Sequence, residues 1–578
     1  MPDAPPPQTT IRFSRWDPPT RQISTPGLSA TLFGDCLSSD QTVADAIVTN
    51  TTPAQAVRAL VHLPGRFGVT VRDGDGIAVA GDLAGTIRWW WTRHNGTIQL
   101  ALSPLPLAQL TGSQVNPLAV AANLFLPDAA PDLSDESIYH GVRELSPSRI
   151  LVISGEHATT ERRPDPSPIP VRDAPEALAE ALATSVRAHT AGAAAVSADL
   201  SGGLDSSTLA LLAARTTDTP ITALTYTDSY SANDDDAGYA LALAKDEPGL
   251  THQVLTGGPE ELPFTDLFGA PVTDLSSLDV LLYARTRFRL APVAGTSVHL
   301  VGGGGDVVLG APITYLADAA RLAGARRFIS ECTGWARLRH RPVHRLVRAA
   351  LVASRTSYRA ALEHAATELD TPPRARRAEH VPRFESSVAW VHVSKSARWA
   401  TPSARAQVAE ALRAGRPGDD QDGADAHTLR LIRWHGSVTR SFLHVADHLG
   451  VPIAAPFFDS DVLAACLSVP AWQRATVHQA KPLLRQAFTG RLPNDLFIRR
   501  TKGDYSACEY HGLRANAGAV RALLTDSRLA DLDIIDAAAV RADLDAAISG
   551  ARAPMGALSQ VLATEVWLRQ LETYTGEA

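Results

Sequence analysis

Short alternating runs of apolar and polar residues fill the first 155 residues of the chain. Two of these runs, residues 66–72 and 76–81, flank Asp73–Gly76, and a later run leads into Asn95-Gly96. Alternation with a period of two predicts half-buried strands, and Asp-Gly or Asn-Gly between two such runs predicts a hairpin turn. The pattern therefore predicts an antiparallel, sheet-rich first domain.

The pattern changes after residues 162–170, where four prolines block both helix and sheet. Beyond this linker, helical runs alternate with short buried runs. The predicted elements are a helix over 176–188, a strand over 194–200, a helix over 207–215 and a strand over 221–227. Alternating strands and helices are typical of a doubly wound parallel sheet. We therefore expect an α/β and α+β protein of two domains, residues 1–165 and 172–578.

Residues 313–450 are mostly helical in pattern and are expected as additions to the second domain. Within them, residues 413–427 are rich in Gly and Asp and are interpreted as a mobile loop. Residues 321–355 carry many arginines, which fit either a peptide- or partner-binding surface or a solvated helix face.

The composition is that of a globular protein, with 578 residues of which 45% are hydrophobic and 20% charged. A net charge of −7 argues against a nucleic-acid binder, which needs a basic surface. No apolar run is long enough to cross a bilayer, and the start Met1–Pro7 lacks the features of a signal peptide, so we expect a cytoplasmic protein without a membrane partner. Its four cysteines are far apart, which predicts buried thiols and neither a zinc site nor a disulfide framework built from them.

The motif Ser201-Gly-Gly-Leu-Asp-Ser-Ser207 lies between a predicted strand and a predicted helix. Its glycines allow the backbone to approach an anion, and the serine hydroxyls and helix N-terminal amides favour negative charge there. The loop has no lysine to reach a terminal phosphate, so it fits pyrophosphate as a leaving group better than phosphoryl transfer. Asp205 would repel phosphate directly but can bind a bridging Mg²⁺. The alternative is a serine-glycine turn with a capping aspartate.

A second loop, Gly302-Gly-Gly-Gly-Asp306, follows another predicted strand at residues 296–301. Ligands of open α/β sheets bind beyond the carboxyl ends of the strands. Asp205 and Asp306 both lie just past such ends, so we expect them to converge on one metal–pyrophosphate unit. The alternative is a flexible glycine turn.

In their order along the chain, these motifs resemble the asparagine synthetase superfamily. Ser201–Ser207 matches its pyrophosphate loop and Gly302–Asp306 resembles its second glycine-rich loop. Pro456–Asp459 resembles its Pro-Phe-hydrophobic-Asp signature, and Lys481–Phe488 with Arg499–Gly503 resembles its C-terminal lysine segment. The first domain is similar to the family's glutaminase domain, which is of the N-terminal-nucleophile type. Its matching stretches are Leu63–Phe67, Gly81–Gly85 and Gly141–Pro147.

The resemblance implies ATP and Mg²⁺ as cofactors and gives each matching residue a role. ATP and pyrophosphate would be bound by Leu200, Ser201, Gly202, Gly203, Asp205, Ser206, Ser207, Thr225, Tyr226, Gly302, Gly303 and Gly304. Asp205 and Asp306 would hold Mg²⁺, while Lys502 would stabilise the charge that develops during adenylation and amide formation.

The chain departs from the family at position 2. The glutaminase nucleophile is a cysteine exposed there after removal of Met1, whereas this chain has Pro2. Proline has no thiol and no primary amine, and Cys36 is internal and lacks an α-amino group of its own. We therefore expect a degenerate glutaminase-like domain and an amine that the substrate itself carries.

A second departure is Gly303, three residues before the loop aspartate. Asparagine synthetases have a glutamate there, and β-lactam synthetases have a tyrosine that takes part in amine deprotonation. The four-glycine loop resembles that of the lasso peptide cyclases. This likeness implies adenylation of an Asp or Glu side chain of a leader-free core peptide. Attack by the peptide's own N-terminal amine would then close a macrolactam, releasing AMP and pyrophosphate.

The partners implied are the core peptide and, as further candidates, a leader peptidase and a leader-binding protein of the same pathway. Two other functions stay open at this point. One is a small-molecule amide synthetase of the β-lactam type or an ammonia-dependent asparagine synthetase. The other is a non-catalytic partner that binds nucleotide or peptide.

Overall fold

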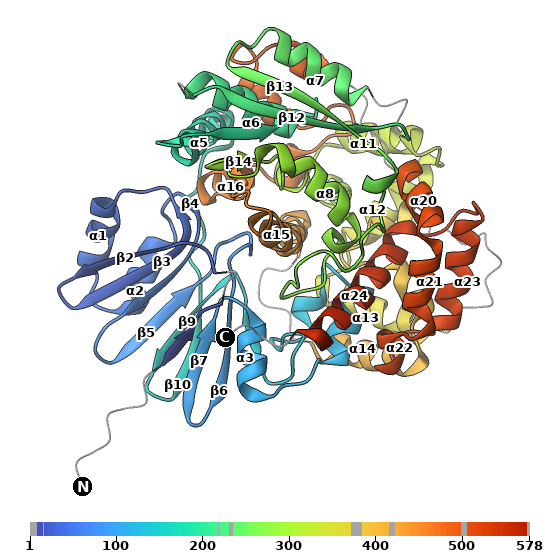
Figure 1. Ribbon diagram of the computed structural model, residues 1–578, viewed down its shortest axis with the longest axis horizontal. Coiled ribbons are helices and arrows are strands. Elements are labelled where there is room, and N and C mark those ends of the chain that lie inside the picture. Colours follow the sequence, from blue (N-terminus) through green and yellow to red (C-terminus); the bar gives the residue numbers. More distant parts are fainter. Residues whose placement is uncertain are drawn as a thin grey trace.

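A computed structural model describes residues 9–14, 17–217, 219–230, 235–371, 384–415, 422–498 and 506–574 (Figure 1). The N-terminal strands are β1 (Thr10–Arg12), β2 (Thr20–Thr25), β3 (Leu28–Cys36), β4 (Gly65–Arg72), β5 (Gly76–Ala80), β6 (Trp89–His94), β7 (Thr97–Ala101), β8 (Arg143–Leu145), β9 (Arg149–Ser154) and β10 (His157–Arg162). The helices among them are α1 (Asp40–Val48), α2 (Pro53–Leu60), α3 (Pro104–Thr111) and α4 (Pro117–Phe125).

These N-terminal elements form four layers. A six-stranded antiparallel sheet, β10-β9-β5-β4-β3-β2, faces a four-stranded sheet, β1-β7-β6-β8, in which only the pairing of β1 with β7 is parallel. Apolar side chains such as Phe33, Trp89 and Leu100 fill the space between the sheets. Helices α1 and α2 cover the outer face of the larger sheet, and α3 and α4 pack on the outer face of the smaller one. The predicted hairpins at residues 73–76 and 95–96 join β4 to β5 and β6 to β7.

The second part of the chain contains a five-stranded parallel sheet. Its strands are β11 (Val196–Asp199), β12 (Ile221–Asp228), β13 (Leu250–Gly257), β14 (Val298–Leu300) and β15 (Ile453–Ala454), in the order β13-β12-β11-β14-β15. The first helices of this part are α5 (Ala174–Thr190), α6 (Leu204–Thr216), α7 (Asp236–Lys245), α8 (Tyr283–Leu290) and α9 (Gly305–Val308). Side chains of α5 and α6 share one core with the sheet, and α8 packs on the other side against Leu224.

Helices make up most of the remaining chain (Figure 1, right). They are α10 (Tyr315–Leu322), α11 (Ala325–Leu338), α12 (Val343–Ala353), α13 (Tyr358–Asp370), α14 (Pro402–Ala414), α15 (Ala424–His448), α16 (Ser460–Leu467), α17 (Ala471–Arg474), α18 (Pro482–Phe488), α19 (Asp495–Ile498), α20 (Ser506–Ala515), α21 (Ala517–Thr525), α22 (Arg528–Asp531), α23 (Ala537–Ile548) and α24 (Met555–Thr573). Short 3₁₀ turns, η6 (Phe384–Ser387) and η7 (Lys395–Trp399), join α13 to α14.

One continuous core joins this helical part to the N-terminal sandwich. Leu105 of α3 and Leu124 of α4 belong to the same buried cluster as Trp399 of η7 and Leu558 of α24. Helix α15 also touches both parts, because a side chain at Gly436 would collide with the backbone of Ala84. The two parts are therefore packed together by apolar contact as well as by their linker.

The structure confirms the predicted fold class, with antiparallel sheets first and a parallel sheet after them. The interpretation of residues 413–427 as a loop is wrong at both ends, because 413–414 finish α14 and 424–427 begin α15. The carboxylate of Asp318 accepts the N–H of Ala424 at 2.7 Å and caps α15 from a distant part of the sequence. Among the described residues, no helix is both long and apolar enough to cross a membrane.

Candidate functional site

The two glycine-rich loops meet at the point where the strand order of the parallel sheet reverses. β11 is paired with β12 on one side and with β14 on the other, with Val196 opposite Val298 and Ala198 opposite Leu300. Because neighbouring parallel strands end at the same edge, the loops after β11 and β14 lie side by side. This edge is where open α/β sheets bind their ligands.

The glycines of the second loop allow the two loops to pack without side chains between them. A Cβ at Gly302 would lie 2.7 Å from the backbone nitrogen of Ser206, and one at Gly305 would collide with the Asp205 carboxylate. Gly304 has a φ of +87° and would meet the Phe458 ring at 2.7 Å. Phe458 belongs to the predicted Pro-Phe signature, so this signature packs directly against the loop.

Gly303 is different from the other three glycines. Its φ lies outside the left-handed region, and the closest described atom to a Cβ at this position would be Val301 Cγ2 at 3.7 Å, an ordinary contact. Backbone packing among the described residues therefore does not require glycine here, and a small side chain would fit.

Hydrogen bonds among its own residues hold the first loop in shape. Gly202 has a φ of +68°, and the hydroxyls of Ser201 and Ser206 lie 2.8 Å apart. The Ser206 hydroxyl also accepts the N–H of Ser201 at 3.2 Å, and the Ser201 hydroxyl accepts that of Gly203 at 3.3 Å. Helix α6 begins directly afterwards at Leu204, so its first N–H groups point toward this loop. Ser207 is fully buried in the helix packing.

Asp205 and Asp306 converge as predicted, and Lys481 joins them. The ammonium group of Lys481, directly before α18, bonds to Asp205 Oδ2 and lies 2.8 Å from Asp306 Oδ1. The Lys481 and Asp205 side chains are 14% and 13% exposed, whereas that of Asp306 is 63% exposed. Although burial opposes its charge, the two carboxylates raise the pKa of Lys481. Lys481 is a further site residue beyond those predicted from the sequence, and it stands in the segment that resembles the family's C-terminal lysine segment.

This arrangement suits a bridging divalent cation. Two carboxylates from neighbouring strand ends already share one positive charge, and carboxylate oxygens are the protein ligands that Mg²⁺ prefers. Asp205 and Asp306 would hold the ion, which would neutralise phosphate charge. Lys481 would then be free to turn toward a phosphate oxygen.

The predicted nucleotide-binding residues of the sheet lie at the same edge. Leu200 is buried; its N–H donates to the Leu224 carbonyl at 2.7 Å, and its own carbonyl accepts the Thr225 hydroxyl. Tyr226 is half-buried, with the Arg285 guanidinium 5.1 Å from its ring centroid, and burial raises its pKa to about 12. The contacts of these residues with ATP stay a prediction. Lys502 lies outside the described residues.

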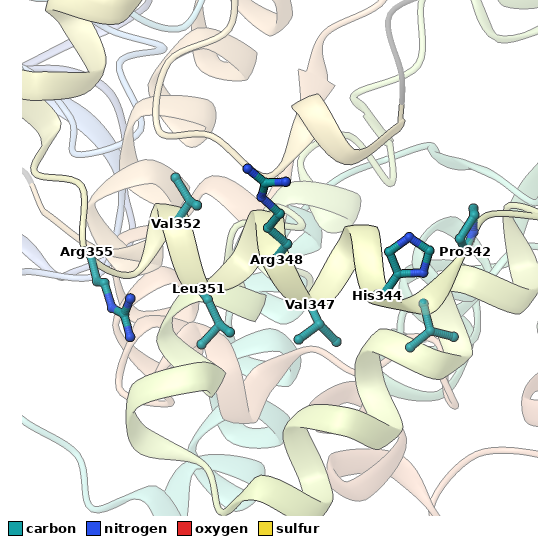
Figure 2. A pocket seen from close by; sticks show the side chains of 8 residues that line it. Pro342, His344, Val347, Arg348, Leu351, Val352 and Arg355 are labelled. Atoms are coloured by element: carbon teal, nitrogen blue, oxygen red, sulfur yellow. The ribbon is translucent and has the colours of Figure 1, made fainter.

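The arginine-rich stretch has one half away from the two loops. Its helix α12 borders a separate open hollow of about 790 Å³ between Pro342 and Arg355, with apolar side chains such as Val347 and Leu351 beside Arg348 (Figure 2). None of the residues lining the hollow belongs to the two loops.

Cys36 belongs to the N-terminal sandwich. This residue ends β3, and burial raises the pKa of its thiol, which disfavours the reactive thiolate. Its neighbour Asp35 is engaged in an ion pair with Arg66 at 2.8 Å. Pro2 lies outside the described residues.

Residues 177–569, more than half of the chain, match the family model of asparagine synthase. The chain belongs to the asparagine synthase family. This family forms amide bonds at the expense of ATP, which agrees with the loops and the charged groups at the sheet edge.

Two solved structures are similar to parts of the chain. One is glutamine phosphoribosylpyrophosphate amidotransferase from B. subtilis complexed with ADP and GMP, with 12% identity and a TM-score of 0.19. It covers 43% of this chain and 64% of its own. The other is the allosteric regulatory enzyme of purine biosynthesis, with 13% identity, a TM-score of 0.18, and coverage of 42% and 63%. This chain thus spans less than two thirds of either. A search of curated protein sequences gave no match.

Proposed function

We propose that this asparagine synthase family member is a lasso peptide cyclase. It activates the side-chain carboxylate of an Asp or Glu in a leader-free core peptide as the acyl-adenylate. The N-terminal amine of the same peptide then displaces AMP and closes a macrolactam. The observation that carries the proposal is the space at Gly303, where the family's small-substrate enzymes place an acid–base side chain and where packing here would tolerate one.

The residues of the sheet edge have distinct tasks in this reaction. The first loop and the start of α6 hold the phosphates of ATP through backbone N–H groups and the Ser201 and Ser206 hydroxyls. Asp205 and Asp306 would hold Mg²⁺, which would neutralise the pyrophosphate leaving group. Lys481 contacts both carboxylates. When the metal ion replaces the lysine between them, the lysine side chain would turn to a phosphate oxygen. These groups favour breaking the bond between the α- and β-phosphates, with pyrophosphate leaving.

The second half-reaction needs proximity more than acid–base chemistry. The attacking amine and the acyl carbon belong to one peptide, so a chain held in a folded shape brings them together. Such positioning can contribute about 7–11 kcal/mol to lowering the barrier. The position beside Gly303 tolerates a peptide loop. Because Pro2 stands where the family has its glutaminase cysteine, the attacking amine is carried by the peptide itself.

The test is mass spectrometry of linear peptides that carry a free N-terminal amine and one Asp or Glu, incubated with the full chain, ATP and Mg²⁺. We expect loss of one water from a peptide substrate, dependent on ATP, with AMP released in equal amount. Asp205→Ala should abolish the product, whereas Asp165→Ala, at an exposed position of the linker, should not. Protease resistance of the product would indicate a threaded ring.

A different result would overturn the proposal. If no peptide loses water but AMP appears with small amino acids, alone or with ammonia, the chain is a small-molecule amide synthetase. If neither kind of substrate gives AMP, the reading as a non-catalytic binding partner gains support.

A further inference from the structure

Three potential metal ligands meet outside the nucleotide site, where the N-terminal sandwich contacts helix α15. Asp128 follows α4, His392 lies between η6 and η7, and His427 is in the first turns of α15. Each offers one ligand atom, and the three atoms lie within 4.8 Å of one another. His427 and Asp128 are 2% and 9% exposed, and His392 is partly buried.

Both imidazoles are fixed by partners on their far sides. His392 Nε2 lies 2.8 Å from the carbonyl of Ser387, and because a carbonyl can only accept, this nitrogen carries the proton. His427 Nδ1 lies 2.9 Å from the hydroxyl of the buried Thr314. Metal-bound histidines are commonly held in this way, with the second ring nitrogen bonded to a carbonyl or another polar group. The nitrogens left to face the cluster are His392 Nδ1 and His427 Nε2.

The cluster has more acceptors than protons. Asp128 brings acceptor oxygens alone, and neutral His392 brings a lone pair on Nδ1. The His427 Nε2 proton can satisfy only one of them, Asp128 Oδ2, at 3.2 Å. Carboxylates and imidazoles bind metals in their deprotonated forms, so these unshared lone pairs are available to a cation.

Among the described residues, His427 is the one ion-pair partner of Asp128, and no lysine or arginine forms an ion pair with it. A buried carboxylate without a cation is costly, and a metal ion is one of the ways in which proteins compensate it.

We propose that Asp128, His392 and His427 bind one zinc ion. Two imidazoles and a carboxylate, without a thiolate, suit zinc, whereas Mg²⁺ and Ca²⁺ prefer oxygen ligands throughout. Bond lengths of about 2.0–2.2 Å in a tetrahedral zinc site place ligand atoms about 3.3 Å apart. Asp128 and His427 already have this spacing, so mainly the partly buried His392 has to approach.

The ion would fasten three parts of the chain that are also joined by hydrogen bonds. The N–H of Ser394 donates to the carbonyl of Phe125 at 2.7 Å, and the Ser396 hydroxyl donates to that of Leu124. Zinc would add a bond from this junction to the start of α15. Eight residues further along α15, roughly 12 Å at 1.5 Å per residue, His435 lies within electrostatic reach of Asp306. The site thus fixes the helix that passes the second glycine loop.

The test uses the full chain without an affinity tag, stripped with EDTA and titrated with Zn²⁺ in excess Mg²⁺ by isothermal calorimetry. We expect one Zn²⁺ per chain and a higher Tm after binding. His392→Ala, at the partly buried edge, should weaken binding at least tenfold by loss of a direct ligand. His344→Ala, at an exposed position of α12, is the matched control and should bind as the unaltered chain does.

Co²⁺ in place of Zn²⁺ adds a spectroscopic readout, since a site with nitrogen ligands gives visible absorption that His392→Ala should change. Asp128→Asn keeps the side-chain shape and should also weaken Zn²⁺ binding while the circular dichroism stays unaltered. Absence of Zn²⁺ binding to the stripped chain, or equal affinity in His392→Ala and the unaltered chain, would overturn the proposal.

Discussion

The N-terminal sandwich and the parallel-sheet region use buried charge in opposite ways. In the sandwich, buried ionic groups are matched locally: Arg66 pairs with Asp35, and Arg88 pairs with Glu144 while donating to the backbone of α15. At the edge of the parallel sheet, two carboxylates are drawn to one lysine beside glycine backbones. The ion pairs of the sandwich stabilise its packing and its contact with α15. The carboxylates and the lysine at the sheet edge can bind a charged ligand.

The largest effect on stability should come from Arg440, which joins the two regions. This buried residue pairs with Asp274 at 2.9 Å and donates to the carbonyls of Thr86 and Leu102 in the sandwich. Arg440→Ala leaves Asp274 buried without this partner and should lower the free energy of unfolding by about 3–5 kcal/mol. Denaturant unfolding measures the change. As a control, Arg348→Ala, at an exposed position of α12, should change the free energy of unfolding by less than about 0.5 kcal/mol. Similar changes in the two variants would show that the stability of the protein does not depend on the Arg440 contact.

A comparable effect on activity is expected at Lys481. Lys481→Met removes the cation shared by Asp205 and Asp306 and should slow ATP-dependent AMP release by about 100- to 1,000-fold. Because one positive charge beside Asp205 and Asp306 is lost, the Tm of the variant should also rise more with Mg²⁺ than that of the unaltered chain. Lys245→Met, at the exposed end of α7, serves as control. If Mg²⁺ raises the Tm of Lys481→Met no more than that of the unaltered chain, Asp205 and Asp306 do not share the Lys481 charge as described.

A smaller and sharper contrast lies within the second glycine loop. Gly304→Ala combines a left-handed φ with a collision against Phe458 and should cost about 1–3 kcal/mol of stability. Gly303→Ala meets an ordinary contact and should cost less than about 0.5 kcal/mol. Thermal unfolding of the two variants side by side tests the difference. Equal destabilisation would mean that the space at Gly303 is smaller than the backbone indicates.

The smallest effect is expected from Cys36→Ala. Because burial raises the pKa of this thiol, it should contribute nothing to glutamine hydrolysis. Ammonia release from glutamine should be absent with and without the substitution, and the rate of AMP formation should be unchanged. Glutamine hydrolysis that disappears in Cys36→Ala would show that the sandwich has kept a reaction of its own.

The parts predicted correctly from the sequence depend on local chemistry. Asp-Gly and Asn-Gly turns fix hairpins within a few residues, and a strand–glycine–helix motif fixes where Asp205 lies relative to the sheet. The parallel sheet then brings Asp306 beside it. These signals need no knowledge of distant residues.

The parts that could not be predicted depend on contacts between distant segments. Lys481 reaches Asp205 across 276 positions, and the start of α15 is capped by Asp318, 106 positions away. The run Gly302–Gly305 contains four identical letters, yet three are required by packing and Gly303 is not. That distinction exists only once the neighbouring atoms are in place.

The core shared by α4 and α24 has a consequence for synthesis on the ribosome. Leu124 and Phe125 emerge roughly 400 residues before Leu558 and Val561, the α24 residues of the same cluster. At about 5–20 residues per second, the side of α4 that α24 covers waits roughly 20–90 s for that helix, whereas α14 and η7 are made earlier. Apolar surface exposed during such an interval is the kind that chaperones protect. Production of the intact enzyme should therefore depend on chaperone supply more than its final stability suggests.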